Sequence, residues 1–199
     1  MGCLGPFSAT FCSKDIFVFI LCLHLFVSLN DPRSYVGEAR NLPGGIIPTL
    51  KMYNALIIQG PNSTEGFNAV QCGGPSPALP NMFGAIFCFD MPLLKKKNLD
   101  SELLGRVQGS WTATQMTGGT IVVSETFILT NSTSLGYRGT FSGLGIEVIG
   151  QKSSKPITGG TGDFELASGV AITTPIGTAQ NDSFGNAFFW FKYEFFFHN

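Results

Sequence analysis

The chain has 199 residues, which is the length of one domain or of one domain behind a leader. Its 12 Lys and Arg residues and 13 Asp and Glu residues give a formal net charge of −1, so no extended basic surface exists for a nucleic-acid backbone. Charged residues make up 13% of the chain and hydrophobic residues 44%, which excludes a mostly disordered protein. With 25 glycines and 19 phenylalanines, the composition is typical of short strands and tight turns around an apolar interior.

The N-terminal part of the chain is typical of a secretory leader. Residues 16–29 form an apolar run that is shorter than the roughly 20 residues needed to span a bilayer, but it fits the core of a signal peptide. We therefore predict that residues 1–39 form a signal peptide and leader, with an uncleaved anchor as the alternative. Residues 40–49 are predicted to form a linker and residues 50–199 the folded domain.

Three Asn-x-Ser/Thr sequons, at Asn62, Asn131 and Asn181, agree with secretion. All three fall in turn-like segments, where a glycan would be tolerated, although such short motifs also arise by chance. We expect a secreted, extracellular glycoprotein.

Two cysteines, Cys72 and Cys88, lie outside the leader. An oxidising compartment permits a disulfide between them, and a buried free thiol at Cys88 is an equal alternative. The two histidines are in the leader and next to the C-terminus, and no Cys/His cluster has the spacing of zinc ligands. We expect no metal site and no cofactor.

Beyond the linker, apolar residues alternate with a period of two rather than the 3.6 residues of a helix. Clusters of Gly, Pro, Asn and Ser, such as 73–77, 131–134 and 159–162, read as turns between these segments. This pattern predicts an all-β fold, either a closed antiparallel barrel or a sandwich. The eight expected strands cover approximately residues 50–59, 83–90, 104–115, 120–130, 137–150, 155–159, 164–173 and 186–197.

One expected strand combines glycines with a carboxylate. Gly139, Gly143 and Gly145 share a strand face with Glu147. Glycine weakens a strand unless the backbone bends sharply or something approaches it closely. The glycines therefore indicate either barrel curvature or space for a ligand.

General-base chemistry in the folded domain would have to come from a carboxylate, because its single histidine, His198, is next to last. Glu147 is the strongest candidate, since the rest of its strand face is glycine and apolar and would partly desolvate it. An ordinary surface glutamate is the alternative. The other candidates are Asp90, Glu125, Asp163 and Glu165, of which Glu125 interrupts an apolar strand face.

Four blocks of sequence occur in a specific order. Residues 83–90 read F-G-A-I-F-C-F-D before Pro92, residues 105–109 read G-R-V-Q-G, Gly139-Thr140 precedes Gly145, and residues 156–169 read P-I-T-G-G-T-G-D-F-E-L-A-S-G. This set resembles the plant dirigent family. The family carries G-R-A-Q-G where this chain has residues 105–109, and P-V-V-G-G-T-G-x-F-x-x-A-R-G where it has residues 156–169. The resemblance covers about residues 50–197, and the sequons at Asn62 and Asn131 also sit where family members carry them.

The resemblance implies an eight-stranded antiparallel β-barrel of the allene-oxide-cyclase-like or calycin type. It also implies a secreted homo-oligomer, a trimer or dimer, in the apoplast. Family members act on phenoxy radicals, typically of the monolignol coniferyl alcohol, which a separate laccase or peroxidase produces. They hold two radicals in one orientation, so that coupling in lignan biosynthesis gives one stereoisomer without oxidative activity of their own.

Carried over residue by residue, the resemblance implies four site residues. Glu147 aligns with a family aspartate and would act as acid and base, and Asn54 stands at an aspartate of the first strand and would be a hydrogen-bonding partner. Trp111 replaces a tyrosine and would be a stacking wall. Asp90, from the F-G-x-x-x-x-x-D block, would be a further substrate-binding residue.

Two family arginines are replaced, one near Ser153 and one at Ser168. The acid–base set therefore departs from the family pattern more than the barrel does. Two other functions stay open: a structural cell-wall protein that organises lignin deposition, and a barrel cyclase or dehydratase acting on a phenolic or flavonoid substrate.

Overall fold

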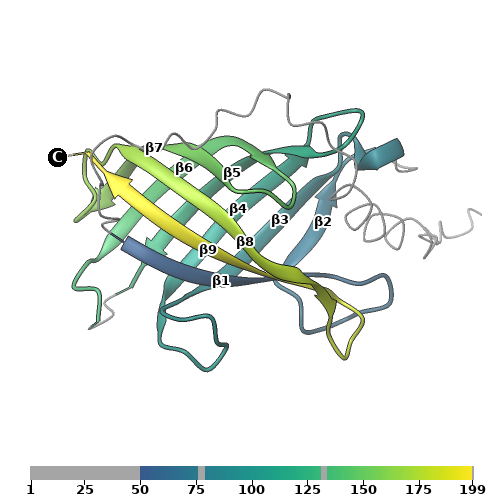
Figure 1. Cartoon of the computed structure of the whole chain (residues 1–199), viewed down its shortest axis with the longest axis horizontal. Helices are drawn as coiled ribbons and strands as arrows, with labels where there is room; N and C mark the ends of the chain where they lie inside the picture. Colours follow the sequence, from purple (N-terminus) through teal and green to yellow (C-terminus); the bar gives the residue numbers. More distant parts are fainter. Residues whose placement is uncertain (1–49, 76–78, 131–133, 199) are drawn as a thin grey trace, which may run out of the picture.

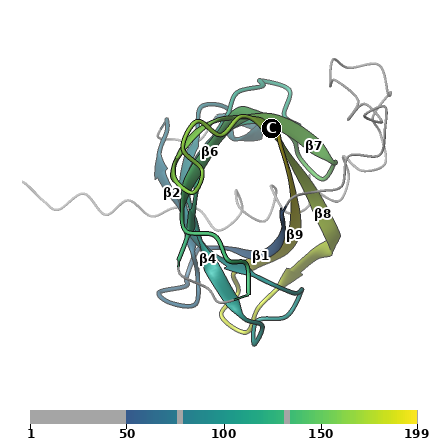
Figure 2. The same ribbon diagram turned by 90° about the vertical axis from the view of Figure 1, so that its left-hand side faces the viewer.

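The computed structural model describes residues 50–75, 79–130 and 134–198, so the predicted leader and linker lie outside the described residues. The described chain forms a closed β-barrel whose strands follow one another in chain order until β9 pairs with β1 (Figure 1). Viewed from one end, the strands form a ring (Figure 2). The prediction of an all-β barrel is confirmed. The elements are β1 (Leu50–Ile58), β2 (Ala69–Gly73), the 3-10 helix η1 (Pro80–Met82), β3 (Ile86–Leu94), β4 (Leu103–Ala113), β5 (Thr120–Leu129), β6 (Gly139–Val148), β7 (Ser153–Gly162), β8 (Gly169–Asn181) and β9 (Ala187–Phe197).

Within the described residues the barrel has nine strands where eight were expected, because the sequence pattern missed β2. This strand has five residues and ends at the predicted Gly-Pro turn, so it is too short to show alternation. It pairs antiparallel with β3 and meets β1 in a parallel sense, at Ile58 and Ala69. Just before β2, Asn68 accepts a hydrogen bond from Ile57 N at 2.8 Å and donates one to Ala55 O at 2.8 Å. The backbones also pair here, with Asn68 N donating to Ile57 O and Gln59 N donating to Ala69 O, each at 2.9 Å. The Asn68 side chain therefore reinforces a short contact between β1 and β2.

A disulfide joins β2 to β3. Cys72 and Cys88 have Cα atoms 5.7 Å apart and lie on the outer face of the barrel. Of the two alternatives for these cysteines, the disulfide is therefore the one that the structure contains. It closes a loop between cysteines 16 residues apart in sequence.

The expected turn at residues 159–162 is wrong, because these residues extend β7 and pair with β6. The chain reverses later, and β8 begins at Gly169. At Gly160, a Cβ atom would lie 2.4 Å from the carbonyl oxygen of Phe164 and 2.5 Å from that of Thr140. Glycine is required at this position by close backbone packing rather than by a turn.

Alternating side chains fill one end of the barrel with aromatic rings. Phe127, Phe141 and Phe195 are fully buried, and their ring centroids lie 4.7 to 4.9 Å apart. These three residues are called the aromatic cluster below. It lies towards the C-terminal end of β9, opposite the β8–β9 hairpin (Figure 1). Among the described elements, none is a helix long and apolar enough to cross a membrane.

Candidate functional site

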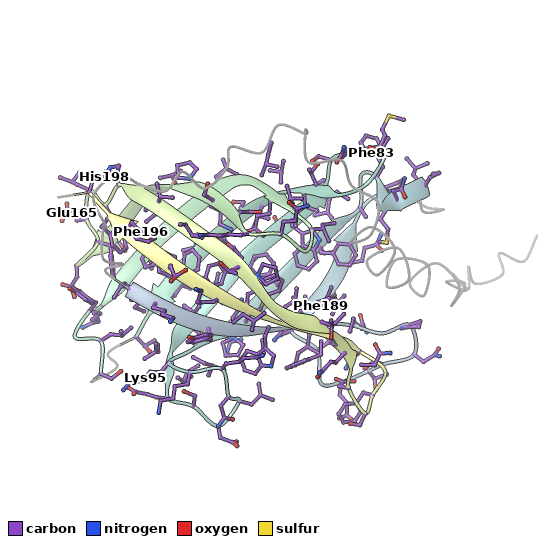
Figure 3. All side chains as sticks on the ribbon, in the orientation of Figure 1. Phe83, Lys95, Glu165, Phe189, Phe196 and His198 are labelled. Carbon is purple, nitrogen blue, oxygen red and sulfur yellow. A yellow bond between two sulfur atoms is a disulfide. The ribbon has the colours of Figure 1, made fainter. Side chains whose placement is uncertain are left out.

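The other half of the barrel encloses a cavity of about 410 Å³. It extends towards the β8–β9 hairpin, because its lining includes β8 residues as far as Ala179 and Phe189 near the start of β9. Figure 3 shows Phe189 on this side, well away from Glu165 and His198 at the C-terminal end. Aromatic side chains form much of the wall, and polar groups line it deeper in the barrel. The aromatic lining residues are Phe89, Trp111, Phe189, Phe191 and Tyr193, and the polar ones include Asn54, Glu125, Glu147 and Thr173.

A buried lysine joins two carboxylates beside the cavity. Lys155 on β7 places Nζ 2.7 Å from Oε1 of Glu125, and both side chains are 1% exposed. The same Nζ donates a hydrogen bond to Oε1 of Glu147 and lies 3.1 Å from Oγ1 of Thr173. Glu125, Glu147 and Lys155 are called the ion cluster below. Its formal charge is −1, because one ammonium meets two carboxylates.

Glu125 is the deepest member of the ion cluster. Its Oε2 accepts a hydrogen bond from the Tyr193 hydroxyl at 3.1 Å, while Oε1 meets Lys155 as an ion pair rather than as a directed hydrogen bond. Burial raises the pKa of Glu125 to about 6, the charge of Glu147 adds to the rise, and Lys155 opposes it. This carboxyl group therefore exchanges its proton under weakly acidic conditions.

Lys155 and Tyr193, which both contact Glu125, are held in their protonated forms. Burial lowers the pKa of Lys155, but the charges of Glu125 and Glu147 outweigh it and raise the pKa above the ordinary value. Burial, with the nearby carboxylates, raises the pKa of Tyr193 well above 10. Lys155 is therefore an ammonium ion and Tyr193 a neutral phenol across the physiological range.

The glycines of β6 make room for the ion cluster. A Cβ atom on Gly145 would lie 2.7 Å from Cβ of Lys155, and one on Gly143 would lie 3.7 Å from Oε1 of Glu125. Barrel curvature and ligand space were the two explanations expected from the sequence. At Gly145 the space is instead occupied by the protein's own Lys155 side chain.

Three of the predicted site residues line the cavity. Glu147 reaches the ion cluster with 15% of its side chain exposed. Trp111 stacks on Phe87, with ring centroids 4.8 Å apart and an interplanar angle of 4°, so its indole is fixed in the wall. Asn54 is fully buried and donates to Met91 Sδ at 3.4 Å, while its Oδ1 has no hydrogen-bond partner. The structure brings these three side chains to one site.

Asp90, the fourth predicted residue, is not part of the cavity. Its side chain is 49% exposed and pairs with Arg106, whose Nε lies 2.5 Å from Oδ1. Successive side chains of a strand point to opposite faces, and Phe89 and Met91 line the cavity. Asp90 therefore faces outwards, which corrects its assignment to substrate binding.

The remaining predicted positions lie on the surface or outside the described residues. Asn62 is exposed in the turn after β1, and Asn181 is exposed at the end of β8. Asn131 lies outside the described residues. The alternative carboxylates Asp163 and Glu165 are exposed between β7 and β8.

The sequence reading missed Lys155 and Tyr193 as site residues. Lys155 shares an inward face with Ile157, and Glu125 interrupts an apolar face on another strand. Opposite charges on two inward faces could have indicated an internal ion pair, but the pairing of the strands was needed to bring them together. Within residues 50–75, 79–130 and 134–198, no group of three or more His, Cys, Asp or Glu side chains could hold a metal ion.

A closed barrel with an aromatic-walled cavity and internal acid–base groups defines a β-barrel protein with an internal site for small, largely apolar molecules. The chain belongs to the dirigent family: the family model described as "Dirigent-like protein" matches residues 47–194.

Curated relatives agree with this family. Dirigent protein 11 of Arabidopsis thaliana is 28% identical over 177 residues, which cover 88% of this chain and 90% of that protein. Pterocarpan synthase 1 of Glycine max is 32% identical over 122 residues, which cover 58% of this chain and 61% of that protein. Among solved structures, the pterocarpan synthase dirigent protein GePTS1 matches with a TM-score of 0.59 at 24% identity, over 75% of this chain and 89% of that one. This structural likeness supports the fold.

Proposed function

We propose that this protein directs the coupling of phenoxy radicals, derived from monolignols such as coniferyl alcohol, to one stereoisomer. A separate laccase or peroxidase would supply the radicals. The observation that carries the proposal is the cavity, which combines flat aromatic walls at Trp111 and Phe89 with the Glu147 carboxylate. Aromatic walls suit planar phenols, and fixing the relative orientation of two radicals is sufficient to select one product.

Glu147 would supply the acid–base step. Coupling of two radicals forms a carbon–carbon bond and leaves quinone-methide groups, which a side-chain hydroxyl then attacks. Glu147 would accept the proton of that hydroxyl, and a proton would be returned to the quinone-methide oxygen, so that charge balances. Asn54 would act as a hydrogen-bonding partner, and Trp111 would stack against one ring.

The test supplies coniferyl alcohol and a laccase with and without the protein, and resolves the products on a chiral column. We expect an excess of one enantiomer with the wild-type protein and a reduced excess with Glu147→Gln. Asp90→Asn is the matched control, because Asp90 is a carboxylate outside the cavity, and it should behave as wild type. A racemic product at stoichiometric protein, across several phenols, would contradict the proposal.

A second candidate is a cyclase or dehydratase acting on a hydroxylated flavonoid. The internal Glu125–Tyr193 pair beside Glu147 supports it, since two carboxylates with different surroundings suit acid–base chemistry. It is also consistent with the similarity to a relative named as a pterocarpan synthase. Turnover of such a substrate without any oxidase, abolished by Glu147→Gln, would identify this activity. Absence of turnover would exclude it for the flavonoids tested.

The setting of the proposed function is the apoplast, with the protein as a secreted, glycosylated homo-oligomer. The apolar run at residues 16–29 and the exposed sequons Asn62 and Asn181 support this setting. Mass spectrometry of protein secreted by plant cells would test it. Recovery of an intact N-terminus without glycans would contradict it.

A further inference from the structure

Lys155 lies behind the cavity wall and does not itself line the cavity. Only 1% of its side chain is exposed, so a ligand in the cavity does not reach its ammonium group. Any effect of Lys155 on the chemistry therefore passes through the side chains that it holds.

The Lys155 ammonium is held by residues of four strands. Glu125, Glu147 and Thr173 surround Nζ from β5, β6 and β8, and the Tyr193 ring of β9 lies against it, with the ring centroid 5.7 Å away. Two oxygens, Oε1 of Glu147 and Oγ1 of Thr173, accept hydrogen bonds from Nζ, and Oε1 of Glu125 meets it as an ion pair. Lys155 is therefore a positive charge held in place by three oxygen atoms.

The two carboxylates that share Lys155 differ in their hydrogen bonds and in their exposure. Glu125 engages both oxygens, one with Lys155 and one with the Tyr193 hydroxyl, and is 1% exposed. Glu147 engages Oε1 with Lys155, lines the cavity and is 15% exposed. Within the described part of the chain, Oε2 of Glu147 has no hydrogen-bond partner. Of the two acids, Glu147 is thus the one with an oxygen left for a ligand.

We infer that Lys155 is a positioning residue for Glu147: it anchors Oε1 beside a fixed positive charge and leaves Oε2 for the proton that the reaction moves. This inference rests on the proposed function, in which Glu147 is the acid–base group. Glu125 completes the arrangement as a second anchor, because its contacts to Lys155 and Tyr193 keep the ammonium in place. The third oxygen contact of Nζ, Oγ1 of Thr173, is uncharged and does not compete with Glu147 for the positive charge.

Gly145 offers a way to move Lys155 without changing any charge. The Cβ atom introduced by Gly145→Ala would lie 2.7 Å from Cβ of Lys155, so the lysine must shift. Gly145 has no left-handed backbone requirement, so alanine is compatible with the strand itself. Gly143→Ala is the matched control, since its nearest neighbour would lie 3.6 Å away, at ordinary contact distance.

The experiment measures the enantiomeric excess of the coupled product and the binding affinity for coniferyl alcohol between pH 4.5 and 8. The proteins are wild type, Lys155→Met, Lys155→Arg, Gly145→Ala and Gly143→Ala. Lys155→Met removes the charge that opposes the raised pKa of Glu125 and releases Oε1 of Glu147, so the maximal excess should fall and its dependence on pH should change. Lys155→Arg should restore most of the wild-type profile, and Gly145→Ala should reduce the maximal excess, whereas Gly143→Ala should not.

Binding affinity separates positioning from loss of the cavity. If Lys155 acts through Glu147, binding in Lys155→Met should stay within about threefold of wild type, since Lys155 touches no ligand. A Lys155→Met or Gly145→Ala protein with an unchanged pH profile and unchanged excess would overturn the inference. Failure of the wild-type protein to direct any coupling would instead overturn the proposed function, so the two failures are distinguishable. If Lys155→Met does not fold, Gly145→Ala and Lys155→Arg still decide the question.

Discussion

The two halves of the barrel interior are built by the same strands but have opposite chemistry. On β5, β6 and β9, the aromatic cluster residues Phe127, Phe141 and Phe195 pack ring against ring with no exposed surface. Two residues away on β5 and β9, Glu125 and Tyr193 begin the polar wall of the cavity. Two residues along each of these strands, one inward-facing position to the next, therefore separate the packed aromatic cluster from the polar part of the cavity.

This difference shows how a charge-poor protein can keep ionised groups inside. Tyr193 lies at the boundary: its ring centroid is 5.0 Å from that of Phe127, in an edge-to-face arrangement, and its hydroxyl donates a hydrogen bond to Glu125. The aromatic cluster excludes water from that side of Glu125, and burial is the largest cause of its raised pKa. The packed aromatic cluster thus contributes to the raised pKa of Glu125 in the half of the barrel that contains the cavity.

The largest effect on stability should come from the aromatic cluster. Phe127→Ala should lower the free energy of unfolding by about 4–5 kcal/mol, because it leaves a void among rings that cannot collapse. Urea denaturation would measure the loss. Phe189→Ala, in the cavity wall, is the control and should cost about 2 kcal/mol or less, because its ring already borders open space. Equal losses would contradict the division of the barrel into a packed half and an open half.

The ion cluster at the boundary should come next. Lys155→Met should cost about 3–4 kcal/mol, because it leaves the buried carboxylate of Glu125 and the half-buried carboxylate of Glu147 without their counter-ion. Lys95→Met removes the exposed partner of Glu102 and should cost about 1 kcal/mol or less. Thermal and urea unfolding of both variants would show the difference. A small loss for Lys155→Met would mean that water reaches the cluster.

The disulfide should matter somewhat less. Cys72→Ser with Cys88→Ser should lower the free energy of unfolding by about 3 kcal/mol, because the unfolded chain regains the freedom of the closed loop. Phe89, beside Cys88, lines the cavity, so backbone protection against hydrogen exchange should fall more around the cavity than around the aromatic cluster. Hydrogen exchange resolved along the chain would detect this. Uniform loosening of both halves would contradict it.

The smallest expected effect depends on pH. The pKa of Glu125 is about 6 in the folded protein and 4.5 ordinarily, so the folded state binds the extra proton between these values. The stability associated with Glu125 is therefore complete below pH 4.5 and is lost as pH rises through 6. Relative to wild type, Glu125→Gln should gain about 2 kcal/mol between pH 4.5 and pH 7. A stability difference that is constant across this range would contradict the raised pKa.

Several features of the fold could be predicted because they follow from local patterns. In β9 the alternation of Phe189, Phe191, Tyr193, Phe195 and Phe197 puts these rings on the inward face, as a period of two requires in a strand. Asp90 was assigned to the site by its motif, whereas strand alternation next to Phe89 places it outside. For Asp90, the alternation of inward and outward side chains along the strand was therefore a better guide to its location than its position in the motif.

Other features depend on contacts between distant segments and could not be read locally. β2 is too short to carry a pattern and is held by Asn68 and by the disulfide to β3. The glycine cluster at residues 159–162 predicts a turn when only the local sequence is considered. The carbonyl oxygens that require glycine at position 160 lie on β6 and beyond β7, so the local pattern does not show them.

By itself, the sequence determined that this protein is an apolar, glycine-rich β-barrel of the dirigent type, since alternation and family motifs are local properties of the chain. It also identified Asn54, Trp111 and Glu147 as candidates for one cavity. Only the tertiary structure decided that Lys155 joins Glu125 to Glu147, because an ion pair depends on which strands become neighbours. The charge state of the site follows from that pairing and from burial, and both exist only once the barrel has closed.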